Sequence, residues 1–369
     1  KAARNLYVMT TLPLEDYNIY VGDCWEAFNG FLADSHYSKI FIIVDENTEQ
    51  LCLPKLKAHC PALLEAQLIR VTAGEQHKNI ESCQHIWSTM MAAKADRKAL
   101  TVNLGGGVIG DMGGFCASTF KRGMDFVQVP TTLLSQVDAS IGGKLGIDFA
   151  DVKNSVGLFA NPKAVFVLPT FLETLPAREL RSGFAEIIKH ALIADHRQWM
   201  SLLQEEDLQQ IAWEQVIVHS LGIKQRVVEE DPFERGLRKA LNFGHTIGHA
   251  VESQALHSDD PLLHGEAIAV GMVAELFLSH KVLGLPLEKV QQATDYLLTH
   301  YGRRRIDLSN PALLLSLMRN DKKNEGGKIN FSLLPELGQV QVNQTCEEAL
   351  ILESLNFYQD SCHQPTNAR

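Results

Sequence analysis

Three histidines and a glutamate are spaced in this sequence in a way that suits a metal ion. His245 and His249 are four residues apart, so they share one face of a helix, and His264 begins a second helical pattern. Upstream, Glu186 is followed by Lys189 three residues later, again on one helical face. Imidazoles with a carboxylate suit zinc and leave room for a substrate oxygen. We therefore predict metal binding by Glu186, His245 and His264, with the remaining histidine as a fourth ligand or a hydrogen-bonding group beside the metal.

Polar residues lead into the histidine pair. Arg238 and Asn242 precede His245 at intervals that continue the helical spacing of the histidines. This spacing predicts one helix over residues 238–254 with all of these side chains on one face. An isolated surface Lys or Arg is usually only solvated, but a polar stripe continuous with metal-type histidines favours contact with a substrate. Lys224 lies on the preceding helical pattern and belongs to the same candidate group.

A glycine-rich segment follows the apolar run 100–104. Gly105, Gly107 and Gly110 lie between that predicted strand and a predicted helix, a context that lets the backbone approach a diphosphate closely. The acidic residue expected about 20 residues beyond such a segment is missing. Asp45 instead ends an earlier predicted strand, where its carboxylate could accept from a ribose hydroxyl. The glycines alone leave dinucleotide binding and a plain strand-to-helix turn both open.

Polar side chains also cluster after the predicted strand 126–129. Those between this strand and the next include Thr131, Thr132, Asp138, Lys144, Lys153 and Asn154. The cluster is either a solvated loop with turn glycines or a place where a nucleotide and a substrate meet. The density of hydroxyl, acidic, basic and amide groups favours the second interpretation.

The elements that must position these residues change character along the chain. Strands are predicted at 39–44, 66–71, 100–104, 126–129 and 164–167, with helical patterns between them, which indicates a mostly parallel sheet covered by helices. From about residue 170 helices dominate, at 180–193, 199–203, 211–229, 265–283, 287–300 and 311–318, with a strand pair near 328–342. We expect an α/β nucleotide-binding domain over residues 1–172 and a mainly α-helical domain over residues 173–369. The tail after Tyr358 is expected to be frayed.

Composition narrows the classes of function. The chain has 369 residues, 45% hydrophobic and 21% charged, which is typical of a globular protein large enough for two cores. The formal net charge of −10 argues against nucleic acid or an anionic membrane as a partner, although local basic clusters leave an anionic small molecule open. Seven scattered cysteines without a CxxC pair argue against a disulfide framework. We expect a cytoplasmic protein, since no signal-peptide pattern and no apolar run of membrane length is seen.

Seven motifs together resemble the sugar phosphate cyclase family, and within it the 3-dehydroquinate synthases. In the family's order they are GGGVIGD (105–111), QVPTTLL (128–134), QVDASIGGK (136–144), AEIIK (185–189), LNFGH (241–245), LHGE (263–266) and DKK (321–323). The resemblance covers residues 15 to 345 and is specific, because several long motifs occur in one order. It implies an NAD-binding α/β domain followed by a helical metal- and substrate-binding domain, and a homodimer.

The resemblance also implies sets of ligands. Zinc, with cobalt as a substitute, would be bound by Glu186, His245 and His264. NAD contacts would come from Asp45, Glu75, Lys78, Gly105, Gly106, Gly107, Asp111, Thr131, Thr132, Asp138, Lys144 and Lys153. Substrate contacts would come from Arg122, Lys144, Asn154, Lys189, Lys224, Arg238, Asn242, His249 and Lys322. Catalytic roles are implied for Lys144, Lys189, Glu186, His249 and Asn154, and Arg122 resembles a residue that reaches the neighbouring subunit's phosphate pocket.

The activity implied by the resemblance is a lyase reaction of the shikimate pathway, which leads to the aromatic amino acids. The enzyme would convert 3-deoxy-D-arabino-heptulosonate 7-phosphate to 3-dehydroquinate and phosphate by transient NAD oxidation, β-elimination, re-reduction and an intramolecular aldol step. The alternatives are a sedoheptulose 7-phosphate cyclase of the same family and a metal-dependent polyol dehydrogenase. Lys224 and Arg238 favour the carboxylated substrate, because Arg offers a bidentate fork to a carboxylate, whereas a neutral polyol needs no such cations.

Overall fold

The computed structural model describes residues 9–150, 152–205, 207–256, 258–319 and 328–363. The chain divides into two compact units, each described by itself below. Unit 1 comprises the residues up to Leu180 together with Ala212–Gln225, and unit 2 comprises Arg181–Ile211 and the residues from Arg226 onward. Among the described residues, no helix is both long and apolar enough to span a membrane.

Unit 1 is built on a seven-stranded sheet. Its order is β1 (Thr10–Pro13), β2 (Asn18–Val21), β9 (Ala164–Val167), β6 (Asp125–Pro130), β5 (Leu100–Gly105), β3 (Ile40–Val44) and β4 (Gln67–Arg70). Every neighbouring pair is parallel except β1 and β2. The central strands are buried on both faces, which explains why they form continuous apolar runs in the sequence.

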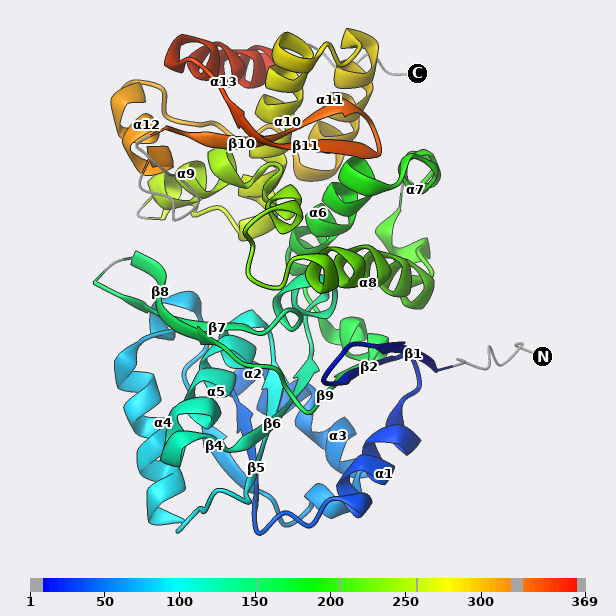
Figure 1. Ribbon diagram of the computed structural model, residues 1–369, viewed down its shortest axis with the longest axis vertical. Helices are drawn as coiled ribbons and strands as arrows, with labels where there is room; N and C mark the ends of the chain where they lie inside the picture. Colours follow the sequence, from blue (N-terminus) through cyan, green and yellow to red (C-terminus); the bar gives the residue numbers. More distant parts are fainter. Residues whose placement is uncertain (1–8, 151, 206, 257, 320–327, 364–369) are drawn as a thin grey trace, which may run out of the picture. The chain divides into compact units, whose positions relative to one another are not determined.

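Helices cover both faces of this sheet (Figure 1). On one face, α1 (Trp25–Asp34) and α3 (Leu53–His59) pack on Val102, Leu104 and Phe166. On the other face, α4 (Ile80–Ala92) and α5 (Gly107–Thr119) pack on Phe41 and Ile43. The short helix α2 (Glu46–Leu51) follows β3 directly. The mostly parallel α/β architecture predicted for this part of the chain is confirmed.

The order of the strands reverses at β3. The chain adds β4 on one side of β3 and then β5, β6 and β9 in turn on the other side. In open parallel sheets, ligands bind beyond the carboxyl ends of the strands at such a switch point. Here the switch point lies between the ends of β3 and β5, which are followed by Asp45 and by the glycine segment.

A separate hairpin was not predicted from the sequence. β7 (Lys144–Phe149) and β8 (Val152–Phe159) pair antiparallel in a sheet of their own. Most of β8 is exposed, so it lacks the alternation of buried and exposed positions by which a strand is normally found. The segment is therefore a two-stranded element, not an irregular loop, and it carries Lys144, Lys153 and Asn154.

Unit 2 is mainly helical, as predicted (Figure 1). Its helices are α6 (Ala177–Ala194), α7 (His196–Leu202), α9 (His245–Ala255), α10 (His264–Leu283), α11 (Leu287–Tyr301), α12 (Pro311–Arg319) and α13 (Glu348–His363), and α8 (Trp213–Glu230) is shared with unit 1. A hairpin of β10 (Asn330–Glu336) and β11 (Gln339–Thr345) completes the unit. Residues 265–279 of α10 are buried throughout, so this apolar helix forms the core around which the others pack.

Two expectations about unit 2 are wrong. A single helix over residues 238–254 does not form, because a 3-10 turn (Leu237–Asn242) ends before α9 begins at His245. Gly244 separates the two in a left-handed conformation (φ +78°), and a Cβ at this position would lie 2.6 Å from Met272 Cγ. The C-terminal tail is also more ordered than expected, since α13 continues beyond Tyr358 to His363.

Candidate functional site

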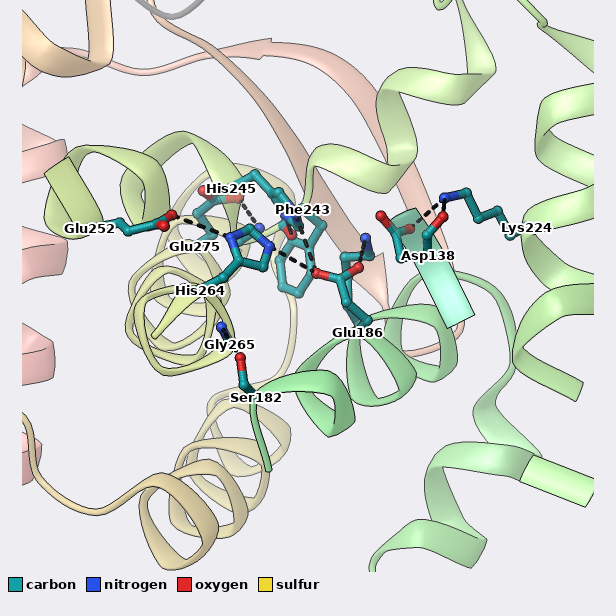
Figure 2. A network of polar contacts seen from close by, with 12 residues as sticks. Asp138, Ser182, Glu186, Lys224, Phe243, His245, Glu252, His264, Gly265 and Glu275 are labelled. Carbon is teal, nitrogen blue, oxygen red and sulfur yellow. Dashed lines mark hydrogen bonds and ion pairs between the residues drawn. The ribbon is translucent and has the colours of Figure 1, made fainter. Parts of the chain in front are cut away.

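Glu186, His245 and His264 converge in unit 2, each from a different helix (Figure 2). Glu186 Oε1 lies 3.4 Å from His245 Nε2 and 3.5 Å from His264 Nε2. One donor atom from each side chain lies within 4.8 Å of the others, and Glu186 and His245 are buried. The three donors that were grouped from sequence spacing therefore face a common point.

The orientation of the His245 ring is set by the backbone at the start of α9. It is the first residue of the helix, and its Nδ1 lies 3.0 Å from the carbonyl oxygen of Phe243. Because a carbonyl can only accept a hydrogen bond, Nδ1 must carry the proton in this contact. The lone pair of His245 is then on Nε2, the nitrogen that faces Glu186. This is the tautomer that can bind a metal through Nε2.

His264 is fixed by neighbours on both sides of its ring. It is the first residue of α10, and the next backbone N–H, that of Gly265, donates to Ser182 Oγ at 3.0 Å. The Nδ1 of His264 lies 3.2 Å from Glu252 Oε2 on α9, while its Nε2 faces Glu186 (Figure 2). A carboxylate behind a ligand imidazole is a recurring arrangement at zinc sites, where it orients the ring and raises its basicity.

The two carboxylate oxygens of Glu186 have different surroundings. It is completely buried in the middle of α6, and Lys189, one turn along, donates a short hydrogen bond to its Oε2. Its other oxygen, Oε1, receives no well-formed hydrogen bond from the described residues. Burial opposes the charged form, but Lys189 and His245 outweigh this effect and hold the pKa of Glu186 well below its usual range. A buried, ionised oxygen aimed at two imidazoles is a suitable metal ligand.

The pKa values of His245 and His264 are shifted in opposite directions. Burial, assisted by the charge of Lys189, lowers the pKa of His245 to about 3, so this ring is neutral. Burial also disfavours a charge on His264, but its contacts with the carboxylates of Glu186 and Glu252 outweigh burial and raise its pKa to about 10. Without a metal, a proton on His264 neutralises part of the local negative charge. A divalent cation at the same point would supply that positive charge instead.

His249 lies one turn beyond His245 on α9 and is half-buried. Its ring centroid is 5.2 Å from that of His245 and 5.9 Å from that of His264. The structure thus brings it to the metal donors, as the spacing predicted. It also belongs to a second group of possible metal donors, with Glu252 and His264.

Arg238 and Asn242 belong to a different local structure from the histidines. Arg238 is buried, and its Nη1 donates to the carbonyl of Pro232 at 2.6 Å. Asn242 Nδ2 donates to Glu234 Oε1 at 2.9 Å. Asp231 holds the turn before them by accepting backbone N–H bonds, including that of Arg238 at 3.0 Å. The single helical stripe proposed for Arg238 and Asn242 is therefore replaced by a loop and a 3-10 turn with their own anchors.

The nucleotide-type residues lie in unit 1, at the switch point of its sheet. Ile43 of β3 pairs with Asn103 of β5, so Asp45 and Gly105 follow at the same level two residues later. Asp45, which comes earlier in the sequence, therefore takes the place of the acidic residue that is missing beyond the glycines. Asp45 also caps α2, since its Oδ1 accepts from Thr48 N at 2.8 Å.

The glycine segment leads directly into α5. Gly106 is the N-cap of this helix and has no side chain with which to cap it, so the first backbone N–H groups remain available to an anion. Thr132 packs against the same turn, because a Cβ on Gly106 would lie 3.1 Å from Thr132 Cγ2. The backbone N–H of Thr131 donates to Gly105 O at 3.0 Å, which ties the ends of β5 and β6 together.

Lys78 is the centre of a polar cluster beside α5. It is buried, and its Nζ lies 2.6 Å from Asp111 Oδ2 and 2.6 Å from Asn154 Oδ1. Burial disfavours its charge, but Asp111 and Glu75 outweigh this and raise the pKa of Lys78, so it stays protonated. Asn154 adopts a left-handed conformation (φ +50°), and its N–H donates to Asp148 Oδ1 at 2.7 Å. The cluster joins the β7–β8 hairpin to the body of unit 1.

A second cation–acid pair lies in the same unit. Lys224 of α8 is buried, and its Nζ donates to Asp138 Oδ1 at 2.8 Å and to the carbonyl of Asp138. Asp138 lies in a π-helical turn (Ser135–Ala139), an irregularity that often marks functional sites. Lys144 is the exposed first residue of β7, and Lys153 is half-buried on β8.

Two of the predicted residues are not brought to these clusters. Arg122 follows the C-terminal end of α5, near the start of β6, so it lies at the edge of the sheet opposite to the glycine segment. It is exposed, in a left-handed turn with Lys121 (φ +67° and +49°). Lys322 lies outside the described residues.

Several residues of the site were missed by the sequence reasoning. Glu252 could have been found, because it lies three residues after His249 on the same face of one helix. Asp231 and Asp148 gave no such signal, because each acts through backbone N–H groups that only the folded loop brings to it.

Comparison with known proteins identifies the family. A family model of the 3-dehydroquinate synthase N-terminal part matches residues 68–182, and one of the C-terminal part matches residues 183–324. A 3-dehydroquinate synthase of Parabacteroides distasonis is 46% identical over 333 residues, which are 90% of this chain and 94% of that protein. One from Enterococcus faecalis is 40% identical over 308 residues, 82% of this chain and 85% of that protein.

A solved structure agrees with this assignment. The structure of 2-epi-5-epi-valiolone synthase from Streptomyces hygroscopicus subsp. jinggangensis, with NAD⁺ and Zn²⁺ bound, has a TM-score of 0.84 and 26% identity. The comparison covers 96% of this chain and 99% of that chain. On the family models and the identity to curated relatives over most of both lengths, the chain belongs to the 3-dehydroquinate synthase family.

Proposed function

We propose that the protein converts 3-deoxy-D-arabino-heptulosonate 7-phosphate to 3-dehydroquinate and phosphate, as an NAD- and metal-dependent lyase. The observation that carries the proposal is the meeting of His245 and His264 at a buried carboxylate oxygen of Glu186, in a chain whose curated relatives are named 3-dehydroquinate synthases. The related cyclase structure that contains NAD⁺ and Zn²⁺ supports the choice of cofactors.

The metal would be held by Glu186, His245 and His264. Two neutral imidazole nitrogens and one carboxylate oxygen suit zinc, with cobalt as a substitute, and three protein ligands are typical of catalytic rather than structural sites. When bound there, zinc supplies a Lewis acid that lowers the pKa of substrate hydroxyls. Lys189, which donates to the other oxygen of Glu186, keeps that carboxylate ionised and its first oxygen directed at the histidines.

NAD⁺ would bind at the switch point of unit 1, where it supplies a hydride acceptor and returns the hydride within one turnover. The uncapped N-terminus of α5 offers backbone N–H groups to the diphosphate. Asp45 offers a carboxylate oxygen to a ribose hydroxyl. The other contacts proposed from the family motifs are Glu75, Lys78, Gly105, Gly106, Gly107, Asp111, Thr131, Thr132, Asp138, Lys144 and Lys153.

The substrate carries a carboxylate and a phosphate, so it needs two sets of donors. We assign the carboxylate to Lys224 and Arg238, because their charges are held in place by buried contacts with Asp138 and Pro232. The phosphate would be bound by Arg122, Asn154, His249 and Lys322, Asn242 would be a further substrate contact, and Lys144 and Lys189 would stabilise developing negative charge. Because Arg122 lies at the edge of the sheet opposite to the glycine segment, we assign it to the site of a second subunit in a homodimer.

A single assay separates this function from its alternatives. Phosphate release from 3-deoxy-D-arabino-heptulosonate 7-phosphate is measured with catalytic NAD⁺ and zinc, while absorbance is followed for NADH. We expect phosphate without net NADH, loss of activity on chelation, and recovery with zinc or cobalt. Turnover of sedoheptulose 7-phosphate instead would indicate the other cyclase, and steady NADH formation would indicate a dehydrogenase.

A matched pair of histidine variants tests the metal assignment within that assay. His264→Ala removes a proposed ligand, whereas His280→Ala changes a histidine of the same helix whose Nδ1 lies 2.7 Å from Leu285 O. We expect the first variant to lose activity and zinc binding and the second to keep both. Full activity of metal-free wild-type protein would refute the metal centre.

A further inference from the structure

A buried carboxylate from α10 lies at the N-terminus of α9. Glu275 is fully buried, and its Oε2 accepts from Gly244 N at 2.7 Å. Its Oε1 accepts from Ile247 N at 3.2 Å. The two donating residues lie on either side of His245 in the chain, and His245 is the first residue of α9 and a proposed zinc ligand. Glu275 therefore acts on α9 as a capping residue would, although it belongs to another helix.

This helix needs a cap from outside because it cannot form its own. The first N–H groups of an α-helix have no partner within the helix, and they are usually satisfied by the N-cap side chain. Here the N-cap is Gly244, which has none. Residues 243–248 are all buried, so bulk water cannot satisfy these groups either. A carboxylate is the best replacement, because it accepts two hydrogen bonds and its charge complements the positive end of the helix dipole.

Close packing of the two helices makes this cap possible. A Cβ on Gly271 of α10 would lie 1.9 Å from Gly244 O, so the backbones of the two elements are in direct contact at this point. Glu275 is one turn further along α10 on the same face. The glycine at position 244 is thus required twice, for its left-handed conformation and for room beside α10. The start of α9 is fixed against the most buried helix of unit 2.

We propose that Glu275 is a positioning residue for the metal centre, acting through the first turn of α9 to fix His245. This inference rests on the metal centre proposed above. On the side of the ring away from Glu186, His245 is oriented by a backbone group, since its Nδ1 contacts the carbonyl of Phe243, which immediately precedes the capped N–H of Gly244. Any shift of this turn moves both the imidazole and the carbonyl that sets its tautomer. Loss of the Glu275 carboxylate would therefore reduce metal affinity without removing a ligand.

The test compares variants with a matched control. Glu275→Gln keeps the size of the side chain but places an NH₂ group against one backbone donor, and Glu275→Asp keeps the charge but shortens the reach. The control is Asp195→Ala, which removes the cap of α7 in the same unit, where Asp195 Oδ1 accepts from Arg197 N at 2.9 Å and Gln198 N at 3.0 Å. It lowers the stability of unit 2 without touching α9.

The measurements are zinc affinity of the metal-free proteins, by competition with a chromophoric chelator, and the visible absorption spectrum of the Co²⁺-loaded proteins. We expect Glu275→Gln to weaken zinc binding about tenfold and to change the cobalt spectrum, with Glu275→Asp in between. Asp195→Ala should keep the wild-type affinity and spectrum at a similar loss of thermal stability. Wild-type affinity and spectrum in Glu275→Gln would overturn the inference, as would equal losses in the control. Absence of zinc binding in the wild type would instead refute the metal centre itself.

Discussion

The imidazole of His264 is held between two carboxylates from different helices. Its Nδ1 lies 3.2 Å from Glu252 Oε2, and its Nε2 lies 3.5 Å from Glu186 Oε1. The two contacts assign a separate role to each carboxylate: Glu186 is a candidate ligand, and Glu252 orients the ring from behind. With Phe243 O behind His245, both candidate imidazole ligands have an acceptor on the nitrogen that does not face Glu186.

Glu252 should accordingly matter for metal binding although it is not a proposed ligand. Removal of an outer carboxylate typically costs about 10–100-fold in metal affinity. We expect Glu252→Gln to weaken zinc binding within this range, measured by chelator competition. Glu353→Gln is the matched control, because it breaks an exposed pair with Lys281 in the same unit. Equal zinc affinities of the two variants would show that Glu252 does not orient His264.

Asp45 offers a test of the nucleotide site in unit 1. Asp45→Asn keeps a good helix cap, because Asn also accepts from the Thr48 N–H, but it removes the charged acceptor proposed for the ribose. We expect NAD⁺ binding to weaken about tenfold with little change in thermal stability, as measured by calorimetric titration and thermal unfolding. Asp96→Asn, which changes an exposed acid bonded to Ser38, should leave NAD⁺ affinity unchanged. Unchanged affinity in Asp45→Asn would place the ribose elsewhere.

The sequence was sufficient for the parts of the site that depend on local spacing. The donors Glu186, His245 and His264 each lie in a short motif whose residue types already indicate metal chemistry, and the parallel sheet was visible in its apolar runs. The break before α9 was not predictable, because the intervals around Asn242 fit a helix equally well. What stops that helix is the contact between Gly244 and α10.

Contacts between residues far apart in the sequence could not be predicted either, because packing brings those residues together. Glu275 lies 31 positions from Gly244 along the chain, and in the sequence it is one glutamate within an apolar helix. Asp45 could be paired with the glycine segment only once β3 was known to be the neighbour of β5. The β7–β8 hairpin escaped detection because most of β8 is exposed and shows no alternation of buried and exposed positions. Such relationships are set by the packing of elements rather than by the properties of any one of them.

Asp231 should make the stability of unit 2 depend on pH. Burial would raise the pKa of this carboxyl, but backbone N–H bonds from Arg235, Gly236 and Arg238 outweigh burial and lower it in the folded state. A lowered folded pKa adds stability above the unfolded value of about 3.8, and this stability is lost as the pH falls through the folded pKa. We expect Asp231→Asn to lower the free energy of unfolding by about 1 kcal/mol at neutral pH.

The difference between wild type and Asp231→Asn should shrink as the pH falls below about 4 and through the lowered folded pKa of Asp231, because the aspartate then becomes uncharged, as the asparagine always is. Denaturant unfolding across this range measures it, with Asp259→Asn as an exposed control in the same unit. A difference that is constant down to the lowest pH would mean that the charge of Asp231 does not contribute.

Replacement of Arg238 should affect binding of the substrate but not binding of NAD⁺. Arg238→Leu removes the proposed partner of the substrate carboxylate, so we expect the KM for the carboxylated substrate to rise about tenfold or more, with NAD⁺ affinity unchanged. Arg235→Leu is the control, because Arg235 is exposed in the same loop and its backbone bond to Asp231 is retained. Equal loss of substrate and NAD⁺ binding in Arg238→Leu would indicate misfolding instead of a lost contact.

Arg122 can be tested by mixing two inactive variants. If Arg122 of one subunit serves the site of its partner, a heterodimer of Arg122→Ala and Lys189→Ala contains one complete site: the first chain keeps Lys189 and receives Arg122 from the second. Random exchange of subunits should then restore about a quarter of the wild-type activity. A mixture of His264→Ala and Lys189→Ala is the control, because both residues belong to unit 2 and every site would lack one of them. If Arg122 acts within its own chain, neither mixture can regain activity, since the only chain with Arg122 then lacks Lys189.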